Sequence, residues 1–246
     1  LTYAVNELVD KDEPFYKWDY QYEKGGPLNR IGPAYIADGL FKDENDIKTS
    51  KDQSAVMPNI KPGDIKYKDL NNDGIINEYD RKYIGDPYIP QIIYGFGGSL
   101  QYKKWDFSVF FQGAAKVSIY LDNIHPFGTY YSNVLQFVAD DYWSESNPNP
   151  NASYPRLAHT VGAENTNQKS TFWLRSGAFL RLKNAEIGFN HKFMRIYLSG
   201  SNLLTFTGFK YWDPEIGGSN NGSHSNGNGL VYPLQRVINL GIQFKF

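Results

Sequence analysis

The stretch DLNNDGIINEYD, residues 69–80, spaces its oxygen-bearing side chains as a calcium-binding loop of the EF-hand kind does. Gly74 stands at loop position 6, where the chain must turn sharply, and Asn77 at position 9, where a water often mediates the contact. Oxygen-only ligands suit a hard cation, so we expect a structural Ca²⁺. The predicted ligands are Asp69, Asn71, Asp73, the backbone carbonyl of Ile75, Asn77 and Asp80.

Two features of this loop depart from a regular EF-hand. Asp80 stands where Glu is usual, and its shorter reach makes bidentate closure of the site weaker. The preceding GDIKYK looks extended, so the loop is not held between two helices. The alternative is a polar turn rich in Asn, Asp and Gly that holds no metal. We favour Ca²⁺ because every ligand position is filled, and we expect the ion to brace the surrounding loop rather than to switch it.

Composition sets broad limits on function. The chain has 246 residues and a formal net charge of −1, and this charge gives no sign of a nucleic-acid partner. It has no cysteine, which excludes disulfides and thiolate metal sites. Aromatic residues make up 16% of the chain, a high share for a soluble domain. No apolar run reaches the roughly 18 residues of a membrane-spanning helix. The motifs GxSxG and HExxH and the P-loop are absent from the sequence, so we expect no enzyme activity.

The last ten residues, VINLGIQFKF, alternate strictly between two faces. A period of two indicates a β-strand with one apolar face and one mostly polar face. The same alternation occurs in IIYGFGGSLQY, WDFSVFFQG, NAEIGFN and RIYLSGSNL, so we expect an all-β fold. The apolar set of the last strand is Ile238, Leu240, Ile242, Phe244 and Phe246.

The lengths of the connections favour a transmembrane barrel over a soluble sandwich. Turns at Lys103-Lys104 and around His191 are short, whereas the connections over roughly 115–178 and 205–235 take about 60 and about 30 residues. Short turns alternating with long loops are typical of outer-membrane barrels, which have short periplasmic turns and long external loops. A soluble sandwich would also alternate along its strands, but it has no reason to sort its loops in this way.

This pattern also sets the direction of each strand. If the last strand ends at the periplasmic side, membrane strands lie over 91–114, 179–204 and 236–246, and residues 10–90, with the calcium-type loop, are extracellular. Residues 2–9 would then form the outward strand before that segment. Six strands cannot close a barrel around a substrate-sized lumen, and open sheet edges are not tolerated in lipid. We therefore expect the sequence to be a fragment of a longer polypeptide.

Six segments carry a resemblance to a known family. They are ADGLF at 37–41, PGDIKYKDLNNDGIINEYDRKYIGDP at 62–87, YGFGGSLQYKKWDFSVFFQG at 94–113, GAFLRLKNAEIGF at 177–189, RIYLSGSNLLTFTGF at 195–209 and YPLQRVINLGIQFKF at 232–246. Together they resemble the C-terminal part of SusC/RagA-type TonB-linked outer-membrane proteins, typical of Bacteroidetes. Their order and spacing cover almost the whole chain, which makes the resemblance specific. One departure is the short turn between Phe189 and Arg195, where many members have a longer connection.

The resemblance implies that these are the C-terminal strands of a large antiparallel transmembrane β-barrel with long extracellular loops. It implies TonB-dependent import of oligosaccharides or peptides across the outer membrane, with a SusD-like surface lipoprotein as a lid. The implied partners are that lipoprotein, outer-membrane lipid and the TonB complex. The TonB complex would act through an N-terminal plug region that has no counterpart in this sequence. The alternative is a soluble, calcium-braced β domain used for adhesion or scaffolding.

Aromatic residues in the expected external loops are candidates for contact with a substrate or with the lid. Aromatic rings offer flat faces on which sugars stack, and they anchor protein interfaces. The alternative, which we weigh more heavily, is that these rings pack the loops against one another. The candidates are Trp18, Tyr130, Tyr131, Trp143 and Trp212.

Overall fold

The chain folds as two compact units in a computed structural model, which describes residues 1–121, 124, 134–158, 168–216 and 232–244. The first unit is formed by residues 1–5, 87–119 and 175–246, and the second by residues 6–86 and 120–174. Within the described residues, no helix is both long and apolar enough to span a membrane.

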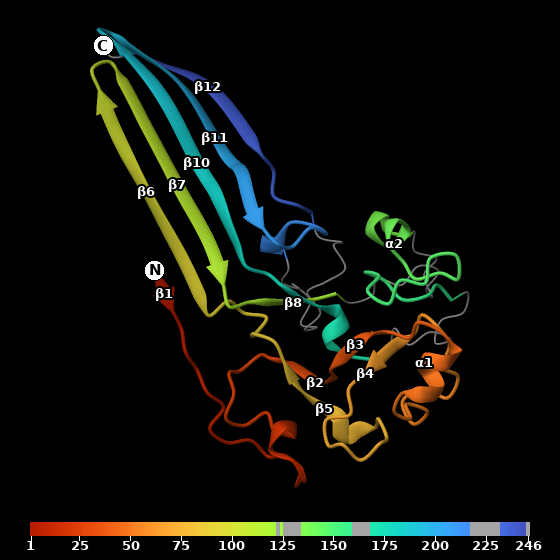
Figure 1. Ribbon diagram of the computed structural model, residues 1–246. Helices are drawn as coiled ribbons and strands as arrows, with labels where there is room; N and C mark the ends of the chain where they lie inside the picture. The colour runs from red at the N-terminus through yellow and green to blue at the C-terminus, as the bar shows by residue number, and fades with distance from the viewer. Residues whose placement is uncertain (122–123, 125–133, 159–167, 217–231, 245–246) are drawn as a thin grey trace. The chain divides into compact units, whose positions relative to one another are not determined.

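The first unit is built on a six-stranded antiparallel sheet in the order β1-β6-β7-β10-β11-β12 (Figure 1). Two tight turns, at Lys103-Lys104 and Lys192-Phe193, join β6 to β7 and β10 to β11. The all-β fold class predicted from the alternation is therefore confirmed. The strands are β1 Thr2–Tyr3, β6 Ile92–Tyr102, β7 Trp105–Ala115, β10 Phe179–His191, β11 Met194–Thr207 and β12 Val237–Phe244.

The strand expected over residues 2–9 is much shorter than predicted. Only β1 pairs with β6. From Asn6 onward the chain belongs to the second unit, where Leu8 exchanges backbone hydrogen bonds with Gly25 and Gly26. The backbone groups of Leu8 are thereby already paired, and they cannot also extend the ladder along β6.

The strand register brings apolar side chains into rows that cross the sheet. Every member of one row is more than a third exposed, from 37% at Ile187 to 74% at Leu240. Large apolar side chains in register on one uncovered face would form an extended patch in water. This row consists of Leu100, Phe107, Ile187, Leu198 and Leu240, and the next row consists of Tyr102, Trp105, Phe189, Ile196 and Ile242.

The opposite face of the same sheet is polar and carries a network of ion pairs. Arg195 on β11 bonds Asp106 on β7 through both Nε and Nη2, and its Nη2 also lies 2.5 Å from Glu186 Oε1 on β10. Gly188 leaves the room for this network, because a β-carbon there would collide with both Arg195 and Asp106. The two faces of the sheet thus differ sharply in polarity.

The second unit is built from short two-stranded sheets and turns. Its core contains the fully buried Leu40, Phe41, Ile65, Ile76 and Tyr154. The paired strands are β2 Ile31–Tyr35 with β5 Arg81–Ile84, and β3 Ala37–Leu40 with β4 Ile65–Tyr67. The strands β8 Ser118–Tyr120 and β9 Leu174–Ser176 also pair, and each has two residues in the first unit and one in the second. The helices are α1 Glu44–Thr49 and α2 Gln136–Asp140, and the 3₁₀ turns are η1 Asp19–Gln21, η2 Glu78–Asp80, η4 Thr171–Trp173 and, in the first unit, η5 Pro214–Ile216.

Candidate functional site

The calcium-type loop 69–80 is anchored in the core of the second unit. β4 leads toward it, and η2 forms its last three residues before β5 begins. Ile76, at loop position 8, is fully buried, and its amide donates a hydrogen bond to the carbonyl of Asp52 at 2.7 Å. The amide of Asp52 donates in turn to the carbonyl of Gly74 at 3.2 Å. The loop is therefore tied to a segment that precedes β4.

The first half of the loop is shaped by its own side-chain oxygens. The amide of Gly74 donates to Asp69 Oδ2, that of Asp73 to Asn71 Oδ1, and that of Ile75 to Asp73 Oδ1, each at 2.9 Å. Gly74 has a φ of 93°, which a side chain would strain. These bonds hold positions 1, 3 and 5 in a tight turn, as the sequence motif requires.

Asp80 closes the loop from the inside. Its Oδ1 accepts from the amide of Leu70 at 2.7 Å, and its Oδ2 accepts from the amide of Asn77 at 2.8 Å. The side chain is fully buried, and no Lys, Arg or His among the described residues lies within ion-pair distance of it. A buried carboxylate that lacks a counter-charge is costly, so a cation in the loop would stabilise this arrangement.

Asp69 shows the same deficit of positive charge. Its side chain is only 4% exposed, and the nearest ammonium, Lys51 Nζ, is 3.8 Å from Oδ2 on a side chain that is 59% exposed. Its other oxygen, Oδ1, is buried and has no hydrogen-bond partner in the described parts of the chain. Buried polar atoms normally have a partner, and position 1 of a calcium loop supplies a carboxylate ligand. The unpaired Asp69 Oδ1 is therefore suited to bind a cation. The residues present therefore fit a hard cation.

The loop does not offer a site made of charged side chains alone. Within the described ranges, no three His, Cys, Asp or Glu side chains are grouped so that they could hold a metal ion. A cation here would need amide and carbonyl oxygens as well, as calcium loops commonly provide. Ligation by the predicted residues remains a prediction.

The predicted aromatic contacts lie in three separate places. Trp18 lies 5.3 Å from the ring of Tyr79, Trp143 is only 6% exposed, and Trp212 packs edge-on against Phe209 in the first unit at 5.1 Å. In each case the ring contacts other parts of its own unit. Tyr130 and Tyr131, like the terminal Phe246, lie outside the residues that the structure describes.

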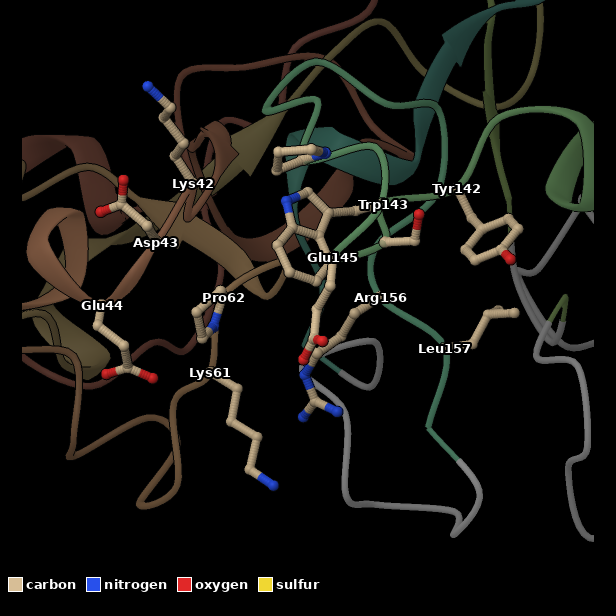
Figure 2. Close-up of a pocket in the computed structure, with 12 residues that line it drawn as sticks. Lys42, Asp43, Glu44, Lys61, Pro62, Tyr142, Trp143, Glu145, Arg156 and Leu157 are labelled. Carbon is tan, nitrogen blue, oxygen red and sulfur yellow. The ribbon is translucent and has the colours of Figure 1, made fainter.

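Trp143 lines an open pocket of about 800 Å³ in the second unit (Figure 2). The indole packs so closely against Gly63 that a β-carbon on that glycine would collide with it. Lys42 and Lys61 extend from the rim in different directions rather than toward one point (Figure 2). These two lysines therefore do not converge on a single point of the pocket.

A buried ion pair that sequence analysis did not anticipate lies beside this pocket. Arg156 Nε donates to Asp64 Oδ1 at 2.7 Å, and the Asp64 side chain is fully buried. Burial raises the pKa of the Asp64 carboxyl, although the Lys61 amide and the Arg156 guanidinium act in the opposite direction. Asp64 belongs to the PGD turn before β4. It lies far from Arg156 in the sequence, so no local pattern predicts that the two side chains pair.

Comparisons of the sequence and of the fold with known proteins identify relatives of this chain. No family model matches the chain. The chain is 33% identical over 200 residues to TonB-dependent receptor P3 of Formosa agariphila, a match that covers 75% of the chain and 19% of that protein. It is 24% identical over 205 residues to TonB-dependent receptor SusC of Bacteroides thetaiotaomicron, covering 79% of the chain and 19% of SusC.

A solved structure of the RagAB peptide importer in its "open-open" state matches 98% of the chain with a TM-score of 0.62. That match covers 25% of the importer chain, and at 19% sequence identity it shows the fold alone. The chain belongs to the SusC/RagA family of TonB-dependent receptors.

This membership confirms the resemblance to C-terminal SusC/RagA sequences. The chain spans about a fifth of the length of the curated relatives it matches. These relatives are receptors, which agrees with the expectation that this SusC/RagA chain is not an enzyme.

Proposed function

We propose that this chain forms part of the wall of an outer-membrane barrel that imports oligosaccharides or peptides with energy passed through TonB. The observation that carries the proposal is the row Leu100, Phe107, Ile187, Leu198 and Leu240 across five strands. Its side chains are exposed, and the face behind them is polar. Lipid on one side of the sheet and an aqueous lumen on the other account for both faces.

The free edges of the sheet support the same proposal. β1 and β12 are the outer strands of the six, so each has one side without a partner in the described sheet. Unpaired backbone groups are not tolerated in the hydrocarbon core, and further strands must therefore pair with these edges. The relatives are long enough to provide them, because each match covers only about a fifth of their length.

Family membership supports the proposed class of substrate and the proposed external partner. RagAB is described as a peptide importer, whereas the aromatic residues of this chain would also suit a glycan. A SusD-like lipoprotein would cover the external mouth as a lid, and the second unit would form part of the external surface that meets it. Co-purification of the full-length protein with such a lipoprotein, and uptake assays with labelled oligosaccharides and peptides, would identify the partner and the substrate.

The cation loop would brace this external unit. The proposed role rests on the buried carboxylates of Asp69 and Asp80, whose charge the described residues leave largely unbalanced. The residues that would hold the ion are those the motif predicts, and bound Ca²⁺ would supply positive charge where their oxygens converge. Calcium is millimolar outside cells, so even a weak site would fill there.

Extraction behaviour tests the main proposal. Full-length protein should fractionate with the outer membrane and require detergent to remain monodisperse. A full-length protein that is monodisperse in plain buffer would instead support the soluble, calcium-braced β domain.

A further inference from the structure

An N-terminal segment docks on the calcium-type loop through aromatic side chains. The ring of Trp18 lies 5.3 Å from that of Tyr79, and the Tyr20 hydroxyl donates a hydrogen bond to the Tyr79 carbonyl at 2.8 Å. Trp18 is the N-cap of η1 and Tyr20 lies within it, and their rings stack with centroids 6.2 Å apart. We refer to Trp18, Tyr20 and Tyr79 as the aromatic latch.

Tyr79 stands within the part of the loop that would close around a cation. It is at loop position 11, between the predicted ligands Asn77 and Asp80. Its amide donates to Asn77 Oδ1 at 2.8 Å, and all three residues belong to η2 or to its N-cap. Any movement of Asn77 or Asp80 toward an ion must therefore reposition the carbonyl and the ring that the latch uses.

The segment over residues 6–30 is otherwise held mainly by contacts within itself. Glu13 accepts a hydrogen bond from the amide of Glu23 at 3.0 Å, and Arg30 Nη2 donates to the Glu23 carbonyl at 2.9 Å. Outside the latch, Arg30 lies over the ring of Tyr83 at 5.5 Å. Phe15, next to the latch, is 98% exposed. Glu23 also hydrogen-bonds the Tyr83 side chain, and η1 contacts β5, so the latch is one part of the contact between this segment and the rest of the unit.

We propose that cation occupancy of the loop 69–80 controls the docking of segment 6–30, with Tyr79 as the coupling residue and Trp18 and Tyr20 as its partners. This inference rests on the proposed cation brace. The electrostatics agree with it: burial, and after it the carboxylates of Asp80, Asp69 and Asp73, raise the pKa of Tyr20. The segment that docks thus lies within the field that a bound cation would neutralise.

Limited proteolysis of the full-length protein in detergent tests the coupling. Trypsin cleaves after Lys11, Lys17 and Lys24 in segment 6–30, and the rate is measured with Ca²⁺ and with chelator. We expect Ca²⁺ to slow cleavage there roughly tenfold, the factor that one ring pair and one hydrogen bond of ordinary strength together provide. Tyr79→Ser, which removes the ring but keeps the carbonyl, and Tyr20→Phe, which removes only the hydroxyl, should each reduce this protection, and the two changes together should abolish it. Phe15→Ala, beside the latch but fully exposed, is the matched control and should behave as wild type.

Calorimetric titration of the same samples with Ca²⁺ separates failure of the latch from failure of the brace. If wild type binds no Ca²⁺, both the brace and the coupling are overturned. If wild type binds Ca²⁺ and residues 42–90 are protected, but cleavage in segment 6–30 is the same with Ca²⁺ and with chelator, the latch alone is overturned. If Tyr20→Phe binds Ca²⁺ as wild type does yet loses protection of segment 6–30, the coupling is supported.

Discussion

Leu198 of β11 lies directly opposite Leu240 of β12, and both side chains are exposed, at 47% and 74%. One residue away along each strand, Ser199 lies opposite Asn239. The sheet therefore changes from apolar to polar between neighbouring positions, and the change is in register across both strands. Such a surface is suited to separating lipid from a lumen.

This relationship makes a sharp prediction for β12. Leu240→Arg should destabilise the folded barrel by about 2–4 kcal/mol, because it places a cation near the bilayer midplane. Asn239→Arg, on the neighbouring residue but on the polar face, should cost little. Gln243 is on the same polar face but lies opposite Arg195, so a change there could also disturb the ion-pair network. Denaturant-induced unfolding in lipid vesicles gives both values, and equal costs at the two positions would argue against the lipid-facing assignment.

The ion-pair network on the polar face makes a second prediction. Arg195→Met removes a cation that bonds both Asp106 and Glu186. We expect a loss of about 1–2 kcal/mol, less than for a fully buried pair because these side chains are partly exposed. Adding Asp106→Asn and Glu186→Gln to the variant should restore much of the loss. Thermal unfolding of wild type, Arg195→Met and the triple variant in detergent measures these changes in stability. If the triple variant is no more stable than Arg195→Met, Arg195 acts through packing.

The strands of this sheet were predictable because their signal is local. A period of two is visible within any ten residues, so alternation alone placed β6, β7, β10, β11 and β12. The irregularity at Lys183 also has a local trace in the sequence, because the apolar positions shift from Leu182 to Ala185 where the strand register shifts. The pairing of Arg195 with Asp106 needed the strand order, which alternation does not contain.

The candidate site was predictable only in its backbone. The motif correctly placed the tight turn at Gly74, because position-specific oxygens and one glycine dictate that geometry locally. The contacts of Trp18 with Tyr79 and of Trp143 with Gly63 join residues far apart in sequence, and no local pattern reports them. The same holds for the pair formed by Asp64 and Arg156.

Asp64 should make the stability of the second unit depend on pH. Its pKa is raised from an ordinary value of 3.8, so the folded state holds this proton more tightly than the unfolded state does. Stability from the protonated carboxyl is therefore present at low pH and is lost as the pH rises from about 4 through the folded pKa. Asp64→Asn should remove this fall. Resistance of the second unit to urea, followed across that pH range, is the measurement.

Removing the partner of Asp64 should be more damaging at neutral pH. Arg156→Gln leaves the buried carboxylate without its cation, at an expected cost of about 3 kcal/mol. The cost should shrink at low pH, where Asp64 is protonated, and the double variant with Asp64→Asn should be more stable than Arg156→Gln alone. A pH-independent loss in Arg156→Gln would show that the arginine contributes mainly by packing beside the pocket.

The last prediction concerns the cation loop itself. Asp69→Ala with Asp73→Ala removes two of the three carboxylates among its predicted ligands and should abolish Ca²⁺ binding. The sheet of the first unit should survive, because its backbone hydrogen bonds do not involve the loop. Residues 42–90 should become protease-sensitive, as wild type does when chelator is added. Asp12→Ala with Asp86→Ala, two exposed acidic residues outside the loop, is the charge-matched control and should keep the response of wild type. If chelator leaves wild type and the loop variant equally protected, the stretch 69–80 acts as a polar turn, and the unbalanced charge of Asp80 must be offset by some means other than a metal.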